Sequence, residues 1–86
     1  MTSVEVKSGA TVCASSNDAH VTADQREVVF DHPAHGTGWN ILTRAVGRST
    51  LFTVSVTEGT GVHAVHWSNQ FKCIRADDQQ CHMSRP

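Results

Sequence analysis

Residues 50–57 are the clearest predicted strand, because from Phe52 to Thr57 apolar and hydroxyl side chains alternate more regularly than in any other part of the chain. The apolar members of the series are Phe52, Val54 and Val56, and the hydroxyl members are Thr53, Ser55 and Thr57. Successive side chains of a strand point to opposite faces, so this period of two predicts a strand with one face in a core and the other in solvent. Such a strand requires partner strands that bury the same apolar face.

Five further segments are short and rich in β-branched or aromatic residues, and turn signals separate them. They are residues 4–6, 10–14, 26–30, 62–67 and 71–74. Short strands at this spacing predict an all-β domain, a small antiparallel sandwich or barrel of about six or seven short strands.

Three further segments add to this prediction of an all-β domain. Residues 39–45 alternate from Trp39 onward, and we expect a strand there as well. Residues 22–30 carry the one weak helical spacing, with Thr22 as its N-cap, although their second half is rich in strand formers. From Asp77 onward the sequence is polar, so we expect a single domain over residues 1–86 with a flexible C-terminal tail from about 77.

The three cysteines allow at most one intrachain disulfide. A Cys73–Cys81 bridge would close a short loop, and a bridge from Cys13 to either partner is the alternative. A third interpretation is that all three thiols are reduced, with two of them packed as small apolar side chains. The spacing does not choose among these readings.

The charge balance excludes several classes of partner. The sequence has seven basic and eight acidic residues, and the lysines and arginines are scattered along it. A nucleic-acid-binding protein usually has a basic stripe, so we expect no nucleic-acid partner. No apolar run could span a bilayer, so we expect no membrane insertion. The first residues lack the apolar core of a signal peptide, which leaves a cytoplasmic protein and a secreted mature form both open.

Motifs for catalysis or metal binding are missing from the chain. No Gly-x-Ser-x-Gly, phosphate loop, Cys-x-x-Cys or His-Glu-x-x-His occurs. His63 and His66 are three residues apart, as are His32 and His35, and on a strand that spacing separates the rings onto opposite faces. We therefore expect no enzyme activity, no resident metal and no other cofactor.

The segment Val62–Phe71 is the strongest candidate for a binding site. We expect a strand, a polar turn at residues 68–70 and the start of another strand. An accessible indole beside amide and imidazole groups suits a sugar, which offers an apolar ring face and hydroxyls. The expected ligand-binding residues are His66, Trp67, Asn69 and Gln70, assisted by Trp39 and Asn40. The alternative for each tryptophan is a place in the core.

These features favour a non-enzymatic, lectin-like module that recognises a neutral glycan. One shallow sugar site binds weakly, so we expect a homo-oligomer that gains from multivalency. The first alternative is a protein-binding module, such as an inhibitor of an enzyme or of a defence system, which would use the same aromatic residues as anchors. The second alternative is a metal-binding domain that uses the histidines.

If His66 accepts a hydrogen bond from the ligand, acidification should weaken binding, because an imidazolium ion has no acceptor. Titration calorimetry with the bound sugar at pH 5 and pH 7.5 measures this effect. Equal affinities at the two pH values would remove His66 from the acceptor role.

Overall fold

Short strands dominate the fold, as the alternating sequence predicts. The computed structural model describes residues 1–86 and contains eight strands, one α-helix and one 3-10 turn. The strands are β1 (Thr2–Ser8), β2 (Thr11–Ser16), β3 (Ala19–Val21), β4 (Glu27–Phe30), β5 (Ala34–His35), β6 (Phe52–Glu58), β7 (Val65–Ala76) and β8 (Cys81–Ser84). The helix is α1 (Trp39–Arg44), and the 3-10 turn η1 (Gly61–His63) lies between β6 and β7. The all-β prediction is confirmed.

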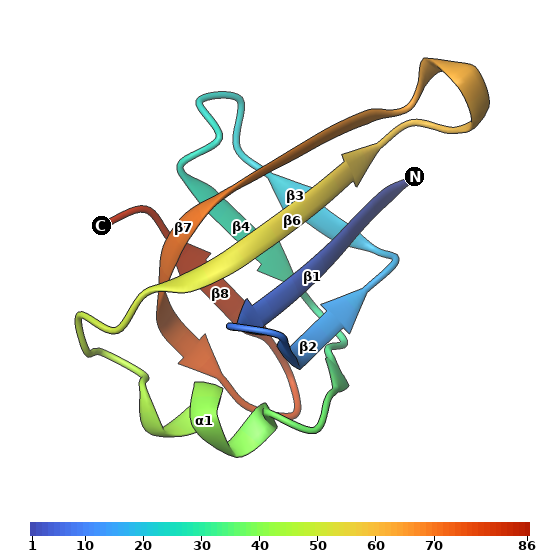
Figure 1. The fold of residues 1–86 in the computed structure, drawn as a ribbon. Helices are drawn as coiled ribbons and strands as arrows, with labels where there is room; N and C mark the ends of the chain where they lie inside the picture. The colour runs from blue at the N-terminus through green and yellow to red at the C-terminus, as the bar shows by residue number, and fades with distance from the viewer.

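All eight strands belong to one curled antiparallel sheet, in the order β3-β4-β8-β7-β6-β1-β2-β5. Only two residues separate β2 from β3, and a bridge between Thr2 and Asp18 brings the start of β3 back beside β1. The sheet therefore curves into a barrel-like shape with α1 at one end and the β6–β7 hairpin reaching out at the other (Figure 1).

The concave side of the sheet holds a core in which every buried side chain is apolar or a cysteine. Phe30, Phe52 and Phe71 are its largest members, and all are fully buried or nearly so. Burying a side chain of this size contributes about 1.5–3 kcal/mol. Phe52, Val54 and Val56 are the buried residues of β6. The alternation in the sequence is therefore the burial pattern of the structure.

The expected strand over residues 39–45 is wrong, because Trp39–Arg44 form α1. Trp39, Leu42 and Ala45 are spaced three apart, which puts them on one side of a helix, and Leu42 and Ala45 are buried against the end of the barrel. The segment fits both the period of two of a strand and the spacing of three of a helix, and the prediction used only the first. The helix is too short to span a membrane, and no other helix is long and apolar enough to do so.

The weak helical reading of residues 22–30 is also wrong. The Thr22 hydroxyl accepts hydrogen bonds from the backbone N–H groups of Arg26 (3.3 Å) and Glu27 (3.1 Å), which closes a turn. Gln25 adopts a positive φ of 58° in that turn, which interrupts a helical path. The strand formers that follow make β4 instead.

The expected flexible tail is wrong, because β8 lies in the middle of the sheet between β4 and β7. Cys81 and Met83 are fully buried, and Nε2 of the intervening His82 donates a hydrogen bond to the Glu27 carboxylate at 2.9 Å. Polar residues 77–80 form the turn that returns the chain, with the Asp77 carboxylate accepting from the backbone N–H groups of Gln79 and Gln80. Local composition identified the turn but not the strand beyond it.

All three cysteines are free and buried, which agrees with the reduced interpretation and with neither disulfide. Burial raises the pKa of Cys73 to about 11, and burial together with the neighbouring Cys73 also raises the pKa of Cys81. A buried thiolate would have little solvation to stabilise it, so these thiols are neutral members of the core.

Two glycines allow α1 to close the end of the barrel. Gly36 donates its N–H to the Cys13 carbonyl, and Gly38 donates to the Val12 carbonyl, both at 2.9 Å. A Cβ atom at Gly36 would lie 2.3 Å from the Val12 oxygen. The backbone of the connection can reach β2 only because this side chain is absent.

Gly36→Ala should therefore reduce the free energy of unfolding by about 1–3 kcal/mol, because the clash is with backbone that cannot move aside. Urea unfolding followed by tryptophan fluorescence measures the loss. Thr37→Ala is the matched control, since Thr37 is exposed between the two glycines and should change stability by less than about 0.5 kcal/mol. Equal stability of Gly36→Ala and the parent would contradict the close approach.

The raised pKa of Cys73 predicts a loss of stability in alkali. Below its ordinary pKa of 9.0 the thiol is neutral in both states, and above that value the unfolded chain ionises while the folded chain stays protonated until about 11. Stability should fall across this window by about 1–3 kcal/mol from this group. Cys73→Val should show a shallower decline in urea unfolding between pH 9 and 11, and identical slopes would contradict the assignment.

Candidate functional site

The outward side chains of β2, β1, β6 and β7 form one surface, which we call the polar face. Its members are Ser15 and the adjoining Asn17, then Ser3, Glu5 and Lys7, then Thr53, Ser55 and Thr57, and finally His66, Ser68 and Gln70. None of these side chains is apolar. The face exists because each strand alternates, so burying the valines turns the hydroxyls outward.

Strand register arranges the polar face in three rows across the sheet. One row runs Ser3, Thr57, His66, and another runs Lys7, Thr53, Gln70. The middle row runs Ser15, Glu5, Ser55, Ser68. Neighbours within a row are about 4.8 Å apart, the spacing of paired strands.

The outer rows are hydrogen-bonded internally. Thr57 Oγ1 lies 3.0 Å from His66 Nδ1, and the Gln70 amide donates to Thr53 Oγ1 at 3.0 Å. Ser3 Oγ donates to Asn17 Oδ1 at 3.4 Å. These contacts fix the side chains on both sides of the middle row.

The middle row is free of such contacts. The hydroxyls of Ser15, Ser55 and Ser68 make no hydrogen bond within the protein, and the Glu5 carboxylate has only Lys7, at 3.3 Å. Three hydroxyls are therefore held in line with their bonding capacity unused, and the carboxylate in the same row has one partner and further acceptor capacity.

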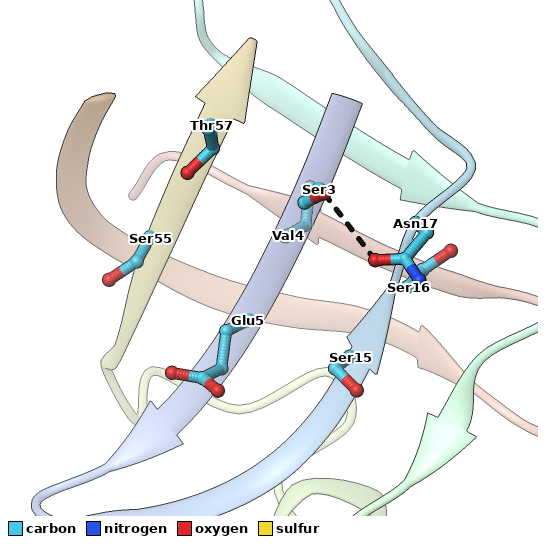
Figure 2. A pocket seen from close by; sticks show the side chains of 8 residues that line it. All are labelled: Ser3, Val4, Glu5, Ser15, Ser16, Asn17, Ser55 and Thr57. Atoms are coloured by element: carbon cyan, nitrogen blue, oxygen red, sulfur yellow. Dashed lines mark hydrogen bonds between the residues drawn. The ribbon is translucent and has the colours of Figure 1, made fainter. Parts of the chain in front are cut away.

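A shallow hollow of about 400 Å³ lies over this row. It is lined by Ser3, Val4, Glu5, Ser15, Ser16, Asn17, Ser55 and Thr57, of which only Val4 is apolar. Figure 2 shows the Ser55 and Thr57 hydroxyls on β6 and the Glu5 carboxylate on β1, with Ser15 and Asn17 contributed by the β2 side. The lining offers hydrogen-bonding groups and a single net charge.

Two smaller hollows continue the first on either side. One of about 280 Å³ shares Ser15, Ser16 and Asn17 with it, and extends beyond β2 to His32. The other, of about 330 Å³, shares Ser55 and Thr57 and extends to His66, Trp67 and Ser68 on β7. The three hollows adjoin through these shared residues, and we call them together the polar trough; their extent across the sheet suits an elongated ligand.

The expected cluster around Trp67 is divided by the strand. The polar turn predicted at residues 68–70 is wrong, because β7 runs without interruption from Val65 to Ala76. His66 and Gln70 therefore lie on the polar face, whereas Trp67 and Asn69 point to the other side of β7.

Trp67 is half-buried and packs against the core, with its ring 6.3 Å from that of Phe71. Its indole Nε1 is buried and has no hydrogen-bond partner in the protein. Asn69 is exposed, and its Oδ1 accepts from the backbone N–H of Gln70 at 2.9 Å. Trp67 thus packs its ring against the core, and it reaches the polar face only as one of the residues that line the hollow between β6 and β7.

Trp39 and Asn40 lie on α1, at the opposite end of the molecule from the tip of the β6–β7 hairpin (Figure 1). Trp39 stacks on His35, with ring centroids 3.8 Å apart and an angle of 8° between the planes, and it also packs against the core. Asn40 is exposed on the helix. The six expected residues therefore occupy three separate places.

Sequence reasoning missed the residues that β1 and β2 contribute, namely Ser3, Glu5, Ser15 and Asn17. Their alternation with buried residues was visible as a signal for strands. Their position beside Ser55 and Thr57 depends on which strands pair, and in what register, and no local pattern specifies that.

The arrangement offers little of what metal binding or nucleophilic catalysis requires. No group of three or more His, Cys, Asp or Glu side chains converges on a point that could hold a metal ion. The one hydroxyl–imidazole pair of the polar face, Thr57 with His66, has no carboxylate to orient the ring. What the face supplies is an array of hydrogen-bond donors and acceptors.

A second surface lies at the end of α1. Ile41, Arg44, Ala45, Arg48 and Thr50 line an open hollow of about 550 Å³. Arg44 and Arg48 have no carboxylate within ion-pair distance. This surface is positively charged and partly apolar, and so differs in kind from the polar face.

No protein-family model, curated protein or solved structure matches this chain.

Proposed function

We propose that the protein is a non-enzymatic binding module that recognises a neutral, polyhydroxylated ligand, a glycan, on the polar face. The observation that supports this proposal is the middle row, in which the strands order the hydroxyls of Ser15, Ser55 and Ser68 with no protein partner, beside the Glu5 carboxylate, whose one partner is Lys7. Hydroxyls and carboxylates are the groups that pair with sugar hydroxyls, because each sugar hydroxyl both donates and accepts.

The charge of the trough favours a neutral ligand. Lys7 lies 3.3 Å from Glu5 and offsets its charge, and the remaining side chains of the middle row are uncharged. Glu5 can still accept hydrogen bonds from two adjacent ligand hydroxyls, and bonds to a charged acceptor contribute about 1.5–3 kcal/mol. Glu5 is therefore the residue on which affinity should depend most.

No aromatic ring of the protein lies flat on the polar face, since Trp67 packs on the other side of β7 and Trp39 stacks on His35. Binding then depends on hydrogen bonds that exchange with water, which gives low affinity at a single site. A homo-oligomer would compensate through multivalency, so self-association belongs to this proposal.

A protein-binding module is the second candidate, favoured by one separate observation. Val62 at the tip of the β6–β7 hairpin is 95% exposed and Val65 is 57% exposed. Apolar side chains so far out of the core suit a contact with another protein. The histidine-based metal-binding alternative has no comparable observation in its favour.

The decisive measurement is a glycan array followed by calorimetry with the sugars that bind. Glu5→Gln should weaken binding about tenfold or more, because it removes a charged acceptor while keeping the side-chain shape. Ser55→Val should also weaken binding, since it removes a central hydroxyl and suits a strand.

Glu27→Gln is the matched control, because Glu27 is an exposed glutamate on β4, away from the polar face, and its substitution should leave affinity unchanged. Trp67→Phe separates the two possible positions of the site. If binding depends on Trp67 and not on Glu5 or Ser55, the ligand lies on the other side of β7. Silence across a broad array would end the glycan proposal.

A further inference from the structure

Strand β7 has a free edge over more than half of its length. The strand has twelve residues, and β6 pairs with it from Val65 to Phe71. Its other neighbour, β8, pairs only from Lys72 to Ala76. No strand pairs with the second edge of residues 65–71.

In an antiparallel ladder, alternate residues direct their N–H and C=O groups toward the neighbour and away from it. The free edge therefore carries unpaired backbone groups in a row, which is a template for another strand. Figure 1 shows this part of β7 running with β6 out to the protruding end of the hairpin.

Proteins usually protect such an edge with charges, prolines, bulges or short strands. Residues 65–71 contain no charged residue and no proline. The first charge, Lys72, stands where β8 begins to pair, and the bulge between Cys73 and Arg75 lies beyond it. The terminal strands differ, because β5 has two residues and follows Pro33, and β3 has only three. The long edge of β7 lacks such protection from Val65 to Gln70, and a charge covers it only at Phe71, where the Arg85 guanidinium lies 5.6 Å from the ring centroid.

We propose that a second copy of this chain pairs with the free edge of β7, antiparallel and around a two-fold axis. A two-fold contact places the same segment on both sides, so the segment must be compatible with itself. With Ser68 on the axis, Ser68 faces its own mate and His66 faces Gln70 of the second copy, since antiparallel partners share a face. No like charges meet in that register.

The chemistry of the segment favours a second copy as the occupant. A charged peptide would find no countercharge along residues 65–71, whereas an identical neutral strand needs none. The net charge of −1 also gives little repulsion between copies. In this register the exposed Val65 lies opposite Phe71 of the second copy, which removes apolar surface from water.

The contact is small. A pair of seven-residue strands buries less than the roughly 1,200 Å² at the low end of stable interfaces, so the dimer should be weak and dependent on concentration. Its consequence for binding rests on the proposed function: a continuous sheet across the axis puts both polar faces on the same side, which makes one bivalent surface.

Sedimentation equilibrium from low micromolar to near-millimolar concentration tests the dimer. The parent protein should shift from monomer to dimer, and Ser68→Lys should raise the dissociation constant at least tenfold, because two lysines meet at the axis. Ser55→Lys is the matched control, since it places the same charge on the same face one strand inward. It should leave dimerisation unchanged even though it disturbs the proposed sugar site, so the two proposals fail separately.

Hydrogen exchange of the parent protein provides a second measurement that needs no variant. Those amides of residues 65–71 that point away from β6 should exchange more slowly as the protein concentration rises. A protein that stays monomeric throughout, or a dimer that tolerates Ser68→Lys and shows no added protection in β7, overturns the proposal. Circular dichroism and thermal melts of both lysine variants establish that any difference is in association and not in folding.

Discussion

Strand β7 pairs with two neighbours, one after the other along its length, and the rest of the structure depends on this pairing. Its first half completes the ladder with β6, and its second half, beyond Phe71, pairs with β8. A strand that changes partners must twist between them, and the bulge at Cys73–Arg75 falls in the part of β7 that pairs with β8, where extra local twist is needed. The curl of the sheet and the long open edge of β7 follow from this change of partner.

The core and the polar face are two results of the same alternation. In β6 the buried valines alternate with threonines and a serine, which point to the convex side. When the valines form the core, these residues therefore form a surface of hydroxyls. Register then decides how these hydroxyls combine. Because Glu5 pairs with both Ser15 and Ser55, a carboxylate stands in the middle of a row of small hydroxyl residues, and the trough has its acceptor at the centre.

Local patterns predicted much of the fold. The strands at residues 4–6 and 50–57 were predicted from alternation that matches one buried face, and the strand at residues 26–30 was predicted from its richness in strand formers. Prediction was wrong where two periodicities coincided, as in residues 39–45, and where polar composition was taken for a turn or a tail. Asn69 and Gln70 have turn-like side chains, yet both pair with residues of β6, and tertiary pairing prevails over weak local preference.

Of the candidate site, the sequence identified His66 and Gln70 but grouped them with Trp67, which the pleat of β7 puts on the other side. Taken alone, the sequence determined that this chain forms strands with apolar and hydroxyl faces, because that property belongs to each segment separately. Which hydroxyls become neighbours, which indole is covered and which edge stays open were decided only by the tertiary structure. These depend on pairing and register between segments far apart in the chain, where burial of a shared core chooses among many local possibilities.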